Sequence, residues 1–204
     1  MFAAAVETEI KRMGIWDRIF GGSFSMPPPE GTNLSDSECF KALRPELPQQ
    51  RRALKALLEA ILICTPDAER SRLVRRALRK LDNGYCPSDA LYEGLVEEKR
   101  GQKLNELALM ACDFRGFDSF EYLAPHLVRA SGITTPFVYS NNSLMTLAEV
   151  LTEFDLWLKP YGRRYLHLNT GGDEYVGFIA REERVAEIIV LAKEAMVQVS
   201  LENF

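Results

Sequence analysis

The sequence predicts an α+β fold, with helices first and a sheet domain after them. Residues 165–180 alternate apolar and polar side chains on both sides of Gly171-Gly172, a pattern typical of a β-hairpin. Residues 185–196 carry apolar side chains at helical spacing, and residues 197–201 alternate again. A hairpin, an amphipathic helix and a last strand are therefore expected in this part of the chain.

The first 46 residues are expected to form an arm and a linker. Residues 1–22 repeat apolar side chains three or four positions apart and predict a short helix that ends at Gly21-Gly22. This helix either covers its own core or docks on a partner or membrane surface, and Met13 is an alternative natural start. Residues 23–46 contain Pro27-Pro28-Pro29 and several serines, which is typical of a linker.

Residues 47–104 are predicted to form a helical subdomain of three helices. The first repeats leucine and isoleucine at helical spacing from Leu54 onward. Thr65 is the expected cap of the second helix, because Pro66 suits the first helical position. The third helix is expected to begin at Ser88.

Residues 105–204 are predicted to form an α+β domain. The apolar run 107–114 is bounded by polar residues and suits a buried strand. Asp118 and Glu121 have the spacing of an acidic capping box, which predicts the start of a helix. A further helix is expected over 147–158.

In order, these segments give a strand, two helices, two strands, a helix and a last strand. This is the order of a ferredoxin-like sheet, a split β-α-β motif, with one extra helix in the first crossover. We expect four strands in one sheet with the crossover helices on one face. The N-terminal helical subdomain is expected to pack on the other face.

Three segments carry a resemblance to a known family. They are the strand end Cys112-Asp113-Phe114, the helix from Asp118 to Leu127, and the hairpin from Leu166 to Val176. Together they resemble a bacterial family of domains of unknown function, over residues 85–204. Because that family has no established activity, the resemblance implies no catalytic residue.

The composition is that of an ordinary globular protein with a small acidic excess. The 204 residues have a formal net charge of −4 and a pI of about 5.4, so the whole chain has no electrostatic preference for nucleic acid or anionic lipid. The four cysteines are widely spaced, as expected for reduced thiols in a cytoplasmic protein. The sequence shows no apolar run of membrane-spanning length, no secretory signal and no cofactor motif.

Acidic side chains fall at positions that one sheet edge can bring together. They are Asp113 at a strand end, Asp118 and Glu121 at a helix start, and Asp173 and Glu174 in the hairpin turn. Such carboxylates can bind a divalent cation or act as an acid and base pair. Capping and turn formation explain the same residues, and we predict no metal site.

His126, His167 and Cys112 complete the candidates for catalysis. Two histidines are too few for a zinc site unless other ligands join them. A buried thiol next to the carboxylate of Asp113 is a poor nucleophile, because the negative charge opposes loss of its proton. We favour a packing role for all three residues.

Residues 44–80 hold ten basic and four acidic side chains, a local charge of +6 that leaves −10 for the rest of the chain. The basic side chains that cluster on one helix are Arg72, Arg75, Arg76, Arg79 and Lys80. Such a stripe either binds phosphates or an acidic partner, or is a solvated helix face.

The sequence therefore favours a non-catalytic protein-interaction or regulatory module, with an immunity-like role as one form of it. Another protein is the expected partner, and a homo-oligomer stays open. One alternative is a metal-assisted hydrolase that uses Asp113, Asp118 and Asp173. The other is nucleic-acid binding through the arginine-rich helix.

Overall fold

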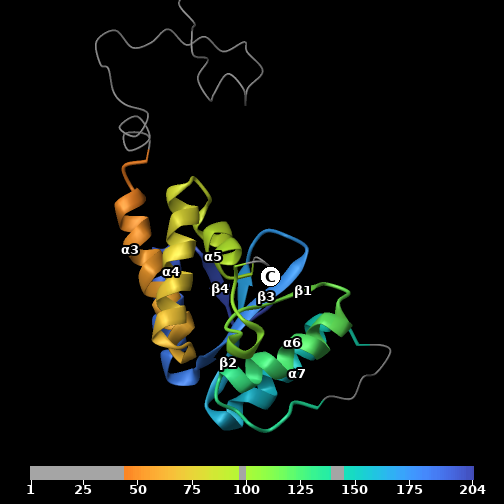
Figure 1. The fold of residues 1–204 in the computed structure, drawn as a ribbon. Helices are drawn as coiled ribbons and strands as arrows, with labels where there is room; N and C mark the ends of the chain where they lie inside the picture. The colour runs from red at the N-terminus through yellow and green to blue at the C-terminus, as the bar shows by residue number, and fades with distance from the viewer. Residues whose placement is uncertain (1–43, 97–99, 139–144) are drawn as a thin grey trace, which may run out of the picture. The chain divides into compact units, whose positions relative to one another are not determined.

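A four-stranded antiparallel sheet organises residues 44–96, 100–138 and 145–204, which are the residues that the structure, a computed structural model, describes (Figure 1). The strand order is β1-β3-β2-β4. The bounds are Met110–Asp113 for β1, Arg163–Asn169 for β2, Glu174–Arg181 for β3 and Gln198–Ser200 for β4. The α+β class is thus confirmed. The arm over 1–22 and the linker as far as residue 43 lie outside the described residues.

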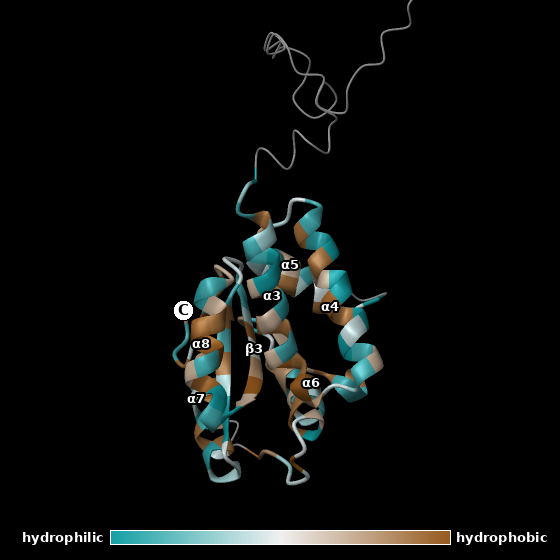
Figure 2. Cartoon of the chain, turned by 90° about the vertical axis from the view of Figure 1, so that its left-hand side faces the viewer, coloured by the Kyte–Doolittle hydropathy of each residue, from teal (hydrophilic) through white to brown (hydrophobic). Residues whose placement is uncertain are grey.

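Six α-helices in the described residues flank this sheet. They are α3 (Leu47–Ile61), α4 (Asp67–Asp82), α5 (Pro87–Val96), α6 (Phe117–Ala130), α7 (Leu147–Leu158) and α8 (Val185–Glu194). Helices α3, α4, α5 and α8 share one hydrophobic core with Leu166 and Phe178 of the sheet. Helices α6 and α7 share a second core with Tyr165, whose side chain leaves β2 on the opposite face from Leu166. Figure 1 shows α6 and α7 on the other side of the sheet from α3 and α4. Figure 2 shows apolar residues along β3 between the helices and polar residues along α4.

The position of α8 corrects an expectation from the sequence. α8 packs against α3 in the first core, so the two crossovers of the sheet lie on opposite faces and not on one. The reason is that β4 pairs with β2 at the far edge from β1. Both crossovers then step in the same direction from antiparallel strands, and the right-handed rule sends their helices to opposite faces. The split β-α-β element order is present, but the last strand and its helix are not placed as in the ferredoxin-like expectation.

The predicted hairpin is formed by β2 and β3, in a register that pairs Leu166 with Phe178. Of the two glycines in its turn, Gly171 alone adopts a left-handed conformation, with a φ of 73°. The side-chain oxygen of Asn169 accepts a hydrogen bond of 2.8 Å from the Gly171 N–H. The turn therefore needs one glycine for its backbone and one asparagine for its hydrogen bond.

Two predicted helix caps are wrong. Helix α6 begins at Phe117, after Gly116, and Asp118 makes no side-chain cap. Helix α4 follows Pro66 without a side-chain hydrogen bond from Thr65. The capping box lies instead at α7, where the Thr146 hydroxyl accepts from the Glu149 N–H at 3.3 Å and the Glu149 carboxylate accepts from the Thr146 N–H at 2.7 Å.

Three cysteines fall in the described residues, and all are free thiols: Cys64, Cys86 and Cys112. None of the helices from residue 44 onward that the structure describes has the length and apolar character needed to cross a membrane. Cys39 lies outside the described residues.

The ring of Tyr165 crosses the neighbouring strand at Gly177. Tyr165 is fully buried, and its ring makes an edge contact with Phe154 of α7 at 5.5 Å between centroids. A Cβ on Gly177 would collide with the end of this phenol ring and lie 2.6 Å from the Leu166 carbonyl oxygen. The absence of a side chain at Gly177 therefore leaves the room that the Tyr165 ring occupies in the second core.

We expect Gly177→Ala to lower the free energy of unfolding by about 2–3 kcal/mol, because the new methyl group meets backbone and a fully buried ring that cannot move away. Urea denaturation followed by circular dichroism measures this loss. Gly172→Ala is the matched control, since its Cβ meets only the Thr170 hydroxyl, at 3.6 Å. The control is expected to change stability by less than about 0.5 kcal/mol, and equal losses in both variants would contradict the packing described above.

Candidate functional site

The polar face of α4 carries the basic stripe that the sequence singles out. Arg75 and Arg76 lie three and four residues after Arg72, and Arg79 lies four and three residues after them, which places all four along one face. With Arg100, Gly101 and Lys103 they line a depression of about 550 Å³, which we call the arginine groove. Among the described residues, every charged side chain that lines the arginine groove is basic.

Arg72 holds the two sides of the arginine groove together. Its guanidinium donates two hydrogen bonds to Glu69, at 2.6 and 2.8 Å, and one each to the carbonyl oxygens of Arg100, at 2.6 Å, and Gly101, at 2.7 Å. Glu69 is buried, and its hydrogen bonds from Arg72 hold its pKa below the ordinary value. Arg72 is thus a structural clamp between α4 and the segment that follows α5.

The segment that carries Arg100 and Lys103 is fixed from its other side as well. The side-chain carbonyl of Gln102 accepts from the N–H groups of Ala108 at 2.9 Å and Leu109 at 3.0 Å, and its amide donates to the Leu109 carbonyl. These bonds tie the segment to the approach of β1. The groove is therefore built by tertiary hydrogen bonds, which no local sequence signal reveals.

The electrostatics of the arginine groove favour an anion. Burial lowers the pKa of Arg76, and the positive charges of Arg72 and Arg100 lower it further. Arg75 and Arg79 are exposed, and neither makes an ion pair with another described residue. Guanidinium groups so arranged can hold carboxylate or phosphate oxygens in bidentate fashion.

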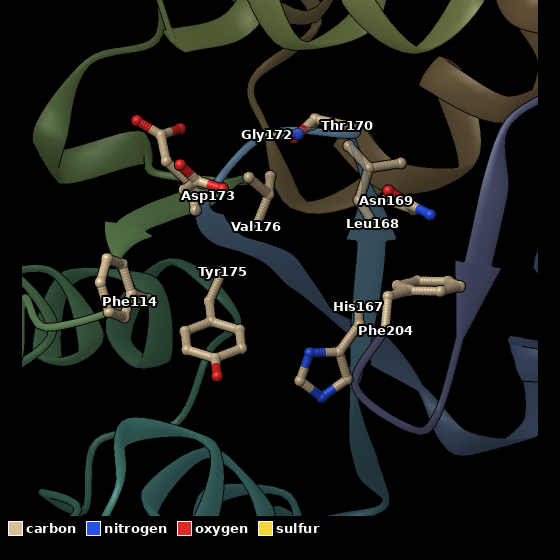
Figure 3. Close-up of a pocket in the computed structure, with 11 residues that line it drawn as sticks. Phe114, His167, Leu168, Asn169, Thr170, Gly172, Asp173, Tyr175, Val176 and Phe204 are labelled. Atoms are coloured by element: carbon tan, nitrogen blue, oxygen red, sulfur yellow. The ribbon is translucent and has the colours of Figure 1, made fainter.

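A second depression lies at the hairpin end of β2 and β3 and has a volume of about 400 Å³; we call it the hairpin cavity (Figure 3). It brings together three of the candidate residues from the sequence, namely His167, Asp173 and Glu174. Glu174 accepts a hydrogen bond of 2.5 Å from the Tyr92 hydroxyl of α5. Burial, with the charge of Glu174, raises the pKa of Tyr92.

The remaining acidic candidates do not join this cavity. Asp113 stands opposite Glu174 in the sheet register, but its carboxylate accepts from the Arg115 N–H at 2.8 Å and caps a turn. Asp118 and Glu121 lie in the first turns of α6. Within the described residues there is no group of three or more aspartate, glutamate, histidine or cysteine side chains arranged to hold a metal ion.

The histidines and Cys112 have separate environments. His126 lies on α6 beside the ring of Tyr122, with 5.6 Å between centroids. Cys112 is buried, and burial together with the charge of Glu174 raises its thiol pKa to about 12, so it keeps its proton at neutral pH. His167 is 4% exposed, and burial lowers its pKa to about 4 although the charge of Asp155 acts in the opposite direction.

His167 makes a testable contribution to stability. Its pKa is about 6.5 in the unfolded chain and about 4 in the folded protein, so the neutral form is favoured by folding. This stabilisation is complete above pH 6.5 and is lost as the pH falls toward 4, at roughly 1.4 kcal/mol per pH unit. Between pH 7 and pH 5 we expect the wild-type protein to lose about 2 kcal/mol more unfolding free energy than His167→Gln, measured by urea titration. Equal losses in the two proteins would show that His167 is not held neutral.

Comparison with known proteins shows the family of this chain. The family model described as a domain of unknown function, DUF6630, matches residues 53–202, which make up most of the chain and include both the arginine groove and the hairpin. The match begins earlier than the resemblance seen in the sequence and takes in most of α3 together with α4 and α5. Searches of curated proteins and of solved structures found no significant match. The chain belongs to the DUF6630 family, a domain of unknown function.

Proposed function

We propose that this domain is a non-catalytic protein-interaction module that binds an acidic segment of another protein in the arginine groove. The observation that carries the proposal is a lining of six basic side chains, with no acidic side chain among the described residues that line it, in a chain of net charge −4. The alternative is that these basic side chains form a solvent-exposed helix face that binds no ligand. A solvated face needs neither a groove nor a clamp, and Arg72 supports a groove whose two sides come from different parts of the chain.

A carboxylate-rich peptide suits the arginine groove better than a nucleic acid does. The groove is lined by one helix and one short segment, so it offers room for a few anionic groups and not for a long phosphate backbone. Among the described residues its lining holds no aromatic ring on which bases could stack. The acidic remainder of the chain also repels a polyanion that extends past the groove.

The hydrolase alternative has less support than the interaction module. Asp113 and Asp118 do not line the hairpin cavity with Asp173, and the described residues offer no cluster of metal ligands. The buried thiol of Cys112 keeps its proton, which leaves it without nucleophilic character. We accordingly propose a binding role in the cytoplasm, where reduced cysteines are the rule, and a regulatory or immunity-like role would use the same groove.

Charge reversal at Arg79 tests this proposal. We expect Arg79→Glu to weaken binding of a fluorescent hexaglutamate peptide about tenfold at low salt, because one guanidinium contact is lost and one repulsion is added. Arg52→Glu is the matched control: Arg52 is an exposed arginine on α3 that does not line the groove. The control makes the same change in net charge and is expected to alter binding by less than about twofold. Fluorescence anisotropy measures both.

The same titration includes a single-stranded oligonucleotide. Tighter binding of the oligonucleotide than of the peptide, weakened by Arg79→Glu and by salt, would overturn the protein partner in favour of nucleic acid. Equal weakening by Arg79→Glu and Arg52→Glu would mean a diffuse charge effect and would overturn the groove. An absence of binding to either probe would also contradict the proposal.

A further inference from the structure

The hairpin cavity has an aromatic lining in addition to its carboxylates. The rings are Phe114 just after β1, Tyr175 on β3, His167 on β2 and Phe204 beyond β4. Figure 3 shows the rings of Tyr175 and His167 projecting to the same side of neighbouring strands, with Phe114 next to Tyr175 and Phe204 next to His167. Each of the four strands therefore contributes one ring to the lining of the hairpin cavity, either from the strand itself or from the residues that follow it.

Two of these rings are unusually exposed for apolar side chains. Phe114 is 48% exposed and Phe204 is 60% exposed, whereas Tyr175 is half-buried. The guanidinium of Arg115 already lies over the ring of Phe114, 4.9 Å from its centroid. A ring of this cavity thus accepts a cation on its face.

His167 contributes a polar ring to the cavity. It is 96% buried, and among the described residues its ring nitrogens make no hydrogen bond, although neither nitrogen is sealed from solvent. Its ring packs edge-on against Tyr165 and borders the cavity. A neutral imidazole so placed offers a ligand one N–H donor and one nitrogen acceptor.

The charge of the hairpin cavity is negative. Asp173 and Glu174 line it, and no basic residue does so among the described residues. Glu174 already accepts a hydrogen bond from Tyr92 of α5, on the face of the sheet that carries the first core, whereas Asp173 makes no ion pair with another described residue. Aromatic faces beside carboxylates are the chemistry that recognises organic cations, whereas they repel phosphates and carboxylates.

We propose that the hairpin cavity binds a small organic cation that has a flat apolar body. The flat body lies on the rings of Tyr175 and Phe204, and the ammonium group points toward Asp173. The cavity volume of about 400 Å³ is in the range of sites for small ligands. This site is separate from the arginine groove and does not depend on the function proposed for the groove.

Three indole compounds separate the parts of this proposal. Tryptamine carries a cation, tryptophol is neutral, and indole-3-acetate carries an anion on nearly the same ring. Titration of each into ¹⁵N-labelled protein, followed by amide chemical shifts, gives affinity and location together. We expect tryptamine to bind about fivefold tighter than tryptophol, with indole-3-acetate weakest, and the shifts to centre on residues 167–176.

Variants assign the binding to the rings and carboxylates. Phe204→Ala is expected to weaken all three compounds, because it removes an exposed stacking surface without opening the core. Asp173→Asn is expected to bring tryptamine close to the affinity of tryptophol. Tyr122→Ala is the matched control, since Tyr122 is also 60% exposed but lies on α6 away from the cavity.

Three outcomes would overturn the proposal. In the first, tryptamine binds no tighter than indole-3-acetate, which would show that the carboxylates do not select the ligand. In the second, no compound gives saturable shifts at residues 167–176. In the third, Tyr122→Ala weakens binding as much as Phe204→Ala does. All three leave the result of the hexaglutamate titration at the arginine groove unaffected.

Discussion

Burial of β2 and β3 on both faces is the constraint on which this fold depends. Tyr165 and Leu166 are neighbours in β2 and both are fully buried, although a strand directs them to opposite sides. Apolar surface is worth about 25 cal/mol per Å² when it is removed from water, so neither face of these strands can remain open. The N-terminal helices with α8 and the pair α6 and α7 are therefore two coverings of a single sheet.

The same constraint explains the special character of the hairpin end. The face of β2 that carries Tyr165 in the second core continues with His167 and Asn169, which border the hairpin cavity instead. The ring of Tyr165 packs over Gly177, and the imidazole of His167 is buried next to the Tyr165 ring, with 4.9 Å between the two ring centroids. A polar ring is thus desolvated by its apolar neighbours, which is the physical cause of its low pKa.

Local signals made the helices, the hairpin and the basic stripe predictable, because each depends on spacing along one segment. Gly171 and the α4 arginines are of this kind. The face of α8 was not predictable in this way, because it follows from the pairing of β4 with β2. The place of Arg100 beside α4 is not predictable for the same reason, because it depends on a hydrogen bond from Arg72, 28 positions away. The capping box at Thr146 and Glu149 has an ordinary sequence signature, and the similar spacing of Asp118 and Glu121 forms no cap, so the signature alone does not separate the two.

The two depressions differ in charge, and the fold keeps them apart. Arg72, with Glu69 buried against it, concentrates basic side chains where α4 meets the segment after α5. The carboxylates of Asp173 and Glu174 stand in and beside the turn of the hairpin, next to α5 through Tyr92. An acidic ligand is attracted to the first surface and repelled by the second, and the reverse holds for a cation. At each surface, side chains of like charge repel one another, and the stability of the fold holds them together against this repulsion. A ligand of opposite charge reduces the repulsion when it binds.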